Sequence, residues 1–328
     1  MKKINIFKGS GGILLVAGCC AATGATAQSG DYPSRQIRLI VPYAPGGIAD
    51  VLSRIIAQPL GASYGRPIVV DNRPGSGGHI GGEIVANGPA DGYTLMLGTI
   101  AHNAAYAMYS RLAYDPAKGL KPVTLIAESA GVLVVHPSLP VKSVADFLAV
   151  ARARPGALAY GSAGHGSALH MAAELFKFLG KVDLVHVPYK GSTPAMTALI
   201  SGETQLTFEN IATALPYVKS NRLRALGVTS RTRNPSLPDI PPIIESGVPG
   251  YESVPYYTIS VAAGVPQDIV RKLSGDIDRV IKMPEIQPRW SGIGVTPLGG
   301  SPDDATKRNV LETERWSKVI KAANIRAE

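Results

Sequence analysis

A short apolar run, a turn and a helical pattern follow one another near the start of the chain. Residues 38–41 are Arg, Leu, Ile and Val, and apolar residues recur at positions 51, 52, 55 and 56, the spacing of one helix face. The segment between them has the proline and glycine content of a tight turn. The pattern predicts a strand, a loop and a helix, with the loop formed by Pro42, Tyr43, Ala44, Pro45, Gly46 and Gly47.

Strand patterns continue to alternate with helix patterns along the chain. The apolar run 123–135 is broken at Glu128 and is long enough to leave one domain and enter another. A closing helix is expected from Ser301, which precedes a proline at the first helical position. The alternation predicts parallel sheets with helices on both faces, with further strands at 67–72, 93–97, 158–160, 204–208, 224–229 and 256–261.

Two glycine-containing loops lead into helix starts, one at residues 43–47 and one at 161–167. The first-turn N–H groups of a helix have no intrahelical partner and carry the positive end of its dipole. Gly46 and Gly47 would let a ligand carboxylate approach such amides closely. The alternative is that the glycines only form the turn. Because the pattern occurs twice, it suits a ligand held between two lobes.

Length and charge narrow the class of protein. At 328 residues and 34.3 kDa the chain suits two domains, and no stretch after the first thirty residues is apolar for long enough to span a bilayer. The net charge is +9, but the basic residues are dispersed and not clustered with aromatic ones. We therefore expect no nucleic-acid partner and a mild attraction for small anions.

The N-terminus has the features of a secretory signal. Lys2, Lys3 and Lys8 precede the apolar run 11–22, and an A-x-A cleavage site ends at Ala27. We therefore expect a signal peptide over residues 1–27 and export to the periplasm. The alternative is lipoprotein processing, because Val16 to Cys19 resembles a lipobox, which would anchor Cys19 to the membrane. Both cysteines lie in this leader, so thiol chemistry is not expected in the exported chain.

Motifs for catalysis, nucleotides and metals are absent from the sequence. The glycines after residue 75 do not fit G-x-G-x-x-G, and no phosphate-binding loop motif occurs. His165 and His170 are five apart, not the i, i+4 spacing of a helical zinc site. Ser162 and Ser167 do not stand in a G-x-S-x-G motif. We expect no catalytic residue, cofactor or metal, and an α/β hydrolase is a remote alternative.

Several motifs, taken in order, resemble the periplasmic solute receptors of tripartite tricarboxylate transporters, the Bug or TctC-like family. No single motif is decisive, but their joint order over nearly the whole exported chain is specific. The resemblance rests on Tyr32-Pro33-Ser34-Arg35, residues 40–47, Asn72-Arg73-Pro74-Gly75, residues 91–95, Tyr160-Gly161-Ser162, residues 186–191, residues 223–226 with 228–230, and Pro249-Gly250-Tyr251-Glu252.

The resemblance implies a two-lobed α/β fold of the periplasmic-binding-protein type II, or Venus flytrap, with a mostly parallel sheet flanked by helices in each lobe. Domain 1 would comprise residues 31–128 and 229–328, and domain 2 residues 129–228. The protein would be a monomer that captures a small organic carboxylate and passes it to the large and small permease subunits of a transporter. An extracytoplasmic ligand sensor with the same fold is the alternative.

The resemblance also implies a carboxylate cradle at the strand-to-helix loops. Two departures concern its chemistry: Glu209 stands where many relatives have Asp, and His102 and His165 are unusual in their loops. The residues alone leave three roles open. Asp50 either stabilises a helix terminus or contacts the ligand, and His170 lies either in the core or in the cleft. Lys190 either faces solvent or contacts the ligand. The expected ligand-binding residues are Tyr43, Ala44, Pro45, Gly46, Gly47, Asp50, Thr99, His102, Asn103, Ser162, Ala163, Gly164, Gly166, Ser167, His170, Tyr189, Lys190 and Glu209.

Overall fold

The computed structural model describes residues 32–327, which fall in one compact unit. The signal peptide expected at residues 1–27, and with it the possible lipid anchor at Cys19, lies outside the described residues. No helix between residues 32 and 327 combines the length and the apolar character needed to cross a bilayer.

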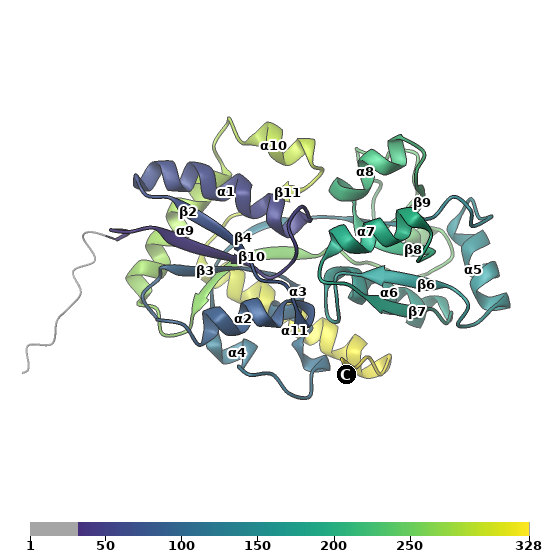
Figure 1. The fold of residues 1–328 in the computed structure, drawn as a ribbon, viewed down its shortest axis with the longest axis horizontal. Helices are drawn as coiled ribbons and strands as arrows, with labels where there is room; N and C mark the ends of the chain where they lie inside the picture. The colour runs from purple at the N-terminus through teal and green to yellow at the C-terminus, as the bar shows by residue number, and fades with distance from the viewer. Residues whose placement is uncertain (1–31, 328) are drawn as a thin grey trace, which may run out of the picture. The chain divides into compact units, whose positions relative to one another are not determined.

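The first sheet has six strands in the order β11-β4-β10-β3-β1-β2 (Figure 1). Its strands are β1 (Ile37–Val41), β2 (Ile68–Asn72), β3 (Thr94–Gly98), β4 (Leu120–Glu128), β10 (Tyr256–Ala262) and β11 (Thr296–Pro297). We call this sheet and its helices lobe 1. Its helices are α1 (Ile48–Tyr64), α2 (His79–Ala86), α3 (Ile100–Asn103), α4 (Pro116–Gly119), α9 (Gln267–Ile281), α10 (Gln287–Gly292) and α11 (Pro302–Ala322), with 3₁₀ turns at Ser76–Gly78 and Tyr106–Met108.

The second sheet has five strands in the order β7-β6-β8-β5-β9, and with its helices forms lobe 2. The strands are β5 (Gly131–Val135), β6 (Ala159–Ser162), β7 (Val185–Pro188), β8 (Leu206–Asn210) and β9 (Arg224–Val228). The helices are α5 (Val144–Ala153), α6 (Ala168–Gly180), α7 (Ser192–Ser201) and α8 (Ile211–Lys219), and a 3₁₀ turn follows at Ile243–Glu245. The break expected in the apolar run 123–135 is confirmed, because β4 and β5 belong to different sheets.

The expectation of a mostly parallel sheet in each lobe is corrected by the strand directions. β1 pairs in parallel with β2 and β3, and β6 with β7 and β8. However, β10 runs antiparallel to β3 and β4, and β5 antiparallel to β8 and β9. Both sheets are mixed because β4, β5, β9 and β10 carry the chain between the lobes and need no helical crossover to their neighbours.

The two segments that cross between the lobes are tied together at Thr229. Its hydroxyl accepts the Gly131 N–H at 2.7 Å and donates to the Ser253 carbonyl at 2.6 Å. The Ser129 N–H also donates to the Pro255 carbonyl at 3.0 Å. The crossing strands are thereby joined at the boundary between the two sheets, where any relative motion of the lobes has to bend the chain.

The chain between β9 and β10 packs mainly on lobe 2. Val228 forms an isolated bridge with Pro242, and Ile243 and Tyr251 are fully buried with side chains of β5, β8 and β9. The end of α11 contributes Trp316 to the same core cluster. Lobe 2 therefore draws part of its core from residues that follow β9.

Helix α11 begins where the sequence predicts. The Ser301 hydroxyl accepts the Asp304 N–H at 3.2 Å, and the Asp304 carboxylate accepts the Ser301 N–H at 2.9 Å. This reciprocal capping box satisfies two N–H groups that would otherwise have no partner. Pro302 occupies the first helical position, where its missing N–H costs no intrahelical bond.

Replacing Ser301 with alanine removes the N-cap acceptor of α11. We expect the free energy of unfolding to fall by about 1 kcal/mol. Urea unfolding followed by circular dichroism measures the change. Ser110→Ala, at an exposed serine outside any helix, is the control and should leave the transition midpoint in place. Equal midpoints for S301A and S110A would contradict a stabilising role for the cap.

Candidate ligand-binding site

A small pocket lies where the starts of four helices meet. Its volume is about 30 Å³, which is room for about one water molecule. α1 and α6 contribute their first residues, and Ser192 and Asn210 stand at the starts of α7 and α8. The pocket is lined by Tyr43, Gly47, Ile48, Ala49, Thr99, Ala163, Ser167, Ala168, Leu169, Ser192, Asn210 and Tyr257.

Three of these helix starts lack a side-chain cap within the described residues. Gly47, Gly191 and Asn210 are the N-caps of α1, α7 and α8, and none accepts a capping hydrogen bond through its side chain. At α6, in contrast, Ser167 accepts the His170 N–H at 3.3 Å. First-turn amides and the positive ends of four dipoles thus surround a pocket whose lining contains no Lys, Arg, Asp or Glu. The arrangement suits an anion.

Asp50 stabilises the first loop from the helix side. Its carboxylate accepts the Gly46 N–H at 3.1 Å and the Arg54 Nε–H at 3.0 Å. Burial alone would raise the pKa of Asp50, but the hydrogen bonds from Arg54 and Gly46 lower it, so the group is ionised near neutral pH. The Gly46 amide, which the sequence assigned to the cradle, is therefore already engaged by Asp50. These contacts match the helix-terminus interpretation of Asp50.

Neutral hydroxyl and amide groups complete the polar lining. The Tyr43 hydroxyl donates to the Gly77 carbonyl at 3.1 Å and lies 3.1 Å from the Thr99 hydroxyl. The Tyr257 hydroxyl donates to Asn210 Oδ1 at 3.2 Å. Burial raises the pKa of Tyr43 to about 12, and it raises the pKa of Tyr257 as well, so both rings stay uncharged.

The rim of the pocket is closed by contacts between the lobes. The Ala44 N–H donates to the Lys190 carbonyl at 3.1 Å, and the Thr193 hydroxyl donates to the Pro45 carbonyl at 2.8 Å. A Cβ atom added at Gly47 would lie 2.6 Å from Ser192 Oγ. Glycine at position 47 thus permits the close approach of α1 and α7.

The second loop is held by Ser162. This side chain is fully buried, accepts the Gly164 N–H at 3.0 Å, and lies 2.6 Å from His186 Nε2. Ala163 and Ser167 line the pocket, while Ser162 does not. A serine beside a histidine resembles a nucleophile and its base. The burial of Ser162 and its bond from Gly164 fit a structural role in the loop.

The rest of this loop lies beside or behind the pocket. A Cβ atom at Gly164 would lie 3.2 Å from Gly77 Cα, so the loop packs tightly on lobe 1. The Gly166 N–H donates to His170 Nδ1 at 3.1 Å. His170 is 3% exposed and is not part of the lining, and its ring centroid is 4.2 Å from that of His186.

Comparison with known proteins identifies the family. The sequence profile described as "Tripartite tricarboxylate transporter family receptor" matches residues 52–325. The chain belongs to this receptor family. Protein BugT of Bordetella pertussis (strain Tohama I) is 32% identical over 314 residues, which cover 94% of this chain and 96% of BugT. The resemblance inferred from the sequence motifs is thereby confirmed.

Solved structures agree with the family assignment. The receptor resembles the structure titled "R. palustris Rpa4515 with adipate" at a TM-score of 0.87 and 40% identity, covering 90% of this chain and 99% of that one. It resembles MatC from Rhodopseudomonas palustris, with bound malate, at a TM-score of 0.84 and 29% identity, covering 88% and 100%. The periplasmic binding protein BugD gives a TM-score of 0.86 at 27% identity, covering 90% and 100%. The two-lobed fold expected from the sequence is confirmed.

Two residues expected at the receptor's site contact the cleft rim through their main chain. The Tyr189 N–H donates to the Ser162 carbonyl at 3.0 Å, while its hydroxyl donates to Glu203 at 2.7 Å. The Lys190 side chain is exposed, and its carbonyl accepts the Ala44 N–H. Neither side chain lines the pocket.

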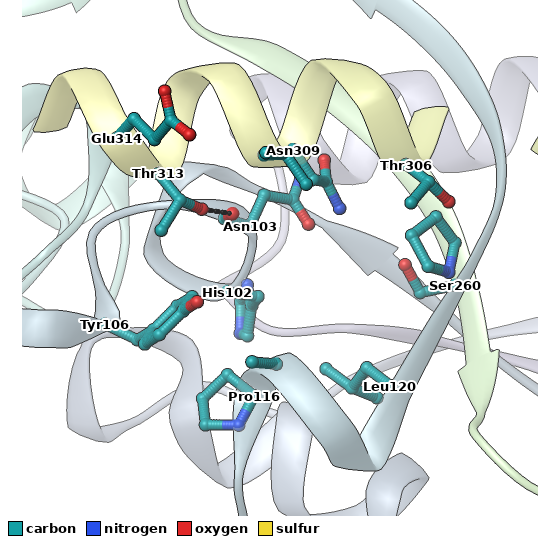
Figure 2. A pocket seen from close by; sticks show the side chains of 13 residues that line it. His102, Asn103, Tyr106, Pro116, Leu120, Ser260, Thr306, Asn309, Thr313 and Glu314 are labelled. Carbon is teal, nitrogen blue, oxygen red and sulfur yellow. Dashed lines mark hydrogen bonds between the residues drawn. The ribbon is translucent and has the colours of Figure 1, made fainter. Parts of the chain in front are cut away.

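His102 and Asn103 line a second pocket of the receptor, with a volume of about 250 Å³ (Figure 2). This pocket lies between α11 and the chain from α3 to β4. His102 bridges Thr99 Oγ1 at 3.1 Å and the Gly78 carbonyl at 2.9 Å. Burial lowers the pKa of His102 to about 4, so it acts here as a neutral hydrogen-bonding group that positions Thr99.

Glu209 lies behind the pocket lining. It is fully buried, and its Oε1 accepts the Asn210 N–H at 2.9 Å and the Thr213 hydroxyl at 2.7 Å. Its Oε2 has no hydrogen-bond partner in the part of the chain that the structure describes. Burial raises the pKa of Glu209 to about 7. Glu209 therefore positions Asn210, and Asn210 itself meets the pocket.

Of the residues expected from the sequence, the structure brings Tyr43, Gly47, Thr99, Ala163 and Ser167 together in the lining. Sequence reasoning missed the other lining residues. Asn210 could have been found, because it stands between a strand and a helix as Gly47 does. Tyr257 comes from the middle of β10 and carries no such signal. The missed residues are Ile48, Ala49, Ala168, Leu169, Ser192, Asn210 and Tyr257.

The buried carboxyl of Glu209 predicts a pH-dependent stability. Its pKa is raised from 4.5 to about 7 by burial, so the folded state favours the protonated form. The free energy of unfolding of the wild type should therefore fall, relative to Glu209→Gln, as the pH rises from about 4.5 to 7. The expected loss is on the order of 3 kcal/mol.

Urea unfolding at several pH values measures this difference. The exposed Glu245→Gln is the control and should follow the wild type at every pH. Parallel pH profiles for E209Q and the wild type would show that the Glu209 carboxyl ionises normally in the folded protein.

Proposed function

We propose that this receptor captures a small organic carboxylate between its lobes in the periplasm and delivers it to the membrane subunits of a tripartite tricarboxylate-type transporter. The observation that carries the proposal is the convergence of four helix starts on one pocket with no charged side chain in its lining. Fixed peptide dipoles recognise a negative charge without an ion pair. The same arrangement disfavours a cationic solute.

The free energies of hydrogen bonds to a charged ligand are large enough to support binding by backbone amides. Hydrogen bonds to a charged group contribute about 1.5–3 kcal/mol each. Three or four such bonds would supply much of the ~8 kcal/mol that a micromolar dissociation constant requires. The relatives point to the same class of ligand, because two of the similar solved structures are of proteins with adipate and with malate, both dicarboxylates.

Ligand entry requires the pocket to open. A volume of about 30 Å³ holds one water molecule and no dicarboxylate. We place the first lobe crossing near residue 128, as the sequence predicts. We place the second near Ser253 and not at residue 228, because residues 229–252, assigned to domain 1 from the sequence, pack on lobe 2. The lobes would then separate by bending near Ser129 and Ser253, which breaks the rim contacts from Ala44 and Thr193.

The proposed site combines the lining with the loops behind it. We assign direct contacts to the lining, and a positioning role to the expected residues outside it: Ala44, Pro45, Gly46, Asp50, His102, Asn103, Ser162, Gly164, Gly166, His170, Tyr189, Lys190 and Glu209. We further propose that the protein is a monomer without catalytic activity, like the solute-binding proteins of its family.

Thermal-shift screening of the purified protein against mono-, di- and tricarboxylates, amino acids and amides tests the proposal. A ligand at 100 times its dissociation constant stabilises the folded state by about 2.7 kcal/mol, so a true ligand is easily detected. We expect stabilisation by one or a few carboxylates and none by the corresponding amides. Stabilisation by amides or cations alone would overturn the assignment.

Asn210→Asp places a negative charge in the pocket with almost no change of shape. If the ligand is anionic, its affinity should fall at least tenfold, since a like charge disfavours binding by more than about 1.4 kcal/mol. Isothermal titration calorimetry with the carboxylate found in the screen measures the loss. Asn87→Asp makes the same change at an exposed position and should leave the affinity unaltered. Tighter binding by N210D would indicate a cationic ligand.

Gly47→Val places a branched side chain against Ser192. Its φ of −80° and ψ of 169° are open to any residue, so we expect lobe 1 to fold normally. The closed arrangement becomes sterically blocked, and the ligand-induced thermal shift should disappear. Gly275→Val, at a glycine whose Cβ position is open, is the matched control. If G47V still shows the full shift, the first loop does not contribute to the site.

A further inference from the structure

Three histidines of lobe 2 lie close together at the loop formed by residues 162–167. His165 lies in that loop, His170 in the first turn of α6, and His186 in β7. Each offers one ring nitrogen, and these three nitrogens all lie within 4.8 Å of one another. The ring centroids are 4.9 Å apart for His165 and His186 and 5.5 Å apart for His165 and His170.

We propose that His165, His170 and His186 form a binding site for a divalent transition-metal ion, with three imidazole ligands and an open coordination position. Imidazole is a preferred ligand of Zn²⁺, Cu²⁺ and Ni²⁺, and three protein ligands with an open position is a common zinc geometry. Tetrahedral zinc with Zn–N distances of about 2.0–2.1 Å separates its ligand nitrogens by about 3.3 Å. The three ring nitrogens now lie up to 4.8 Å apart, so they need to approach one another by at most about 1.5 Å to bind zinc.

The hydrogen-bonding states of His165 and His186 suit metal ligands. His165 Nδ1 is buried and has no hydrogen-bond partner among residues 32–327. His186 Nε2 lies 2.6 Å from the Ser162 hydroxyl, and when Nε2 donates its proton there, Nδ1 carries the lone pair that a metal requires. Such a second-shell partner fixes the tautomer of a ligating histidine. A buried ring nitrogen without a partner is unfavourable in a purely structural cluster.

The charged groups near the cluster leave room for a cation. Lys177 lies close to His170 and His186, but its ammonium group is paired with the Glu174 carboxylate at 2.8 Å.

Metal binding would change the loop that borders the carboxylate pocket. His170 Nδ1 now accepts the Gly166 N–H at 3.1 Å. If His170 binds the metal through Nδ1, the Nδ1 lone pair is no longer available as an acceptor. If it binds through Nε2, the neutral ring carries its proton on Nδ1, which then cannot accept a hydrogen bond. In both cases the Gly166 amide loses its acceptor. The His165 carbonyl also accepts the Tyr109 hydroxyl of lobe 1 at 2.8 Å, so the loop is linked to the contact between lobes.

The test uses the purified protein without a polyhistidine tag, treated with a chelator and dialysed. Calorimetric titration with ZnCl₂, together with elemental analysis, should give one zinc per chain. His165→Ala and His186→Ala should each weaken zinc binding by at least tenfold, because removing even a residue that only hydrogen-bonds a metal ligand commonly costs that much affinity. His136→Ala, a histidine of lobe 2 outside the cluster, is the matched control and should bind zinc as the wild type does.

A second measurement separates a metal site from a packed cluster of rings. In NMR spectra of ¹⁵N-labelled protein, zinc should shift the Gly166 amide resonance in the wild type and in H136A, but not in H165A. Circular dichroism and thermal unfolding confirm that each variant is folded. Absence of stoichiometric zinc binding, or equal affinity in H165A and the wild type, would overturn the proposal, whatever carboxylate the receptor binds.

Discussion

The proposed binding site depends on peptide dipoles that are fixed in position by the two sheets. α1, α6, α7 and α8 start at the pocket, and among residues 32–327 three of the four starts find no side-chain cap. An uncapped, partly buried helix start is unfavourable in itself, because its N–H groups lose water without gaining a partner. The arrangement becomes favourable when an anion supplies the acceptors. The same helix starts are therefore the basis of both the proposed anion binding and the proposed closure around the ligand.

Closure also depends on small residues and on the crossing segments. Gly47 and Gly191 bring the backbones of α1 and α7 into contact, since a Cβ at either would meet the other lobe within 3 Å. Thr229 joins the two crossing segments through its hydroxyl and its N–H, so the lobes are linked by a pair of strands that share hydrogen bonds. If the lobes open as proposed, such a link would restrict bending to a narrow region and favour the return of the helix starts to the same relative positions.

Local patterns in the sequence predicted local structure well. The strand, loop and helix at residues 38–56 and the capping box at Ser301 follow from neighbouring residues alone, and the structure has both. The two elbows named from the sequence do meet at one pocket through Gly47 and Ser167. Strand direction and the contributions of Tyr257 and Ser192 depend on contacts between distant segments, which no local pattern encodes. The spacing argument likewise compared His165 with His170 alone, and no local pattern shows that His186, from another strand, lies beside them.

The charged groups around the pocket are either paired or largely neutralised by burial. Asp50 is next to the first loop, but Arg54 and the Gly46 amide balance its negative charge. Glu209 is closest to Asn210, and burial keeps a large share of this carboxyl protonated near neutral pH. His102 is neutral for the same reason. Because a buried, weakly polar environment strengthens each remaining interaction, the partial charges of the helix starts act on a ligand with little competition. Burial of these ionisable groups thus supports the proposed preference for an anion.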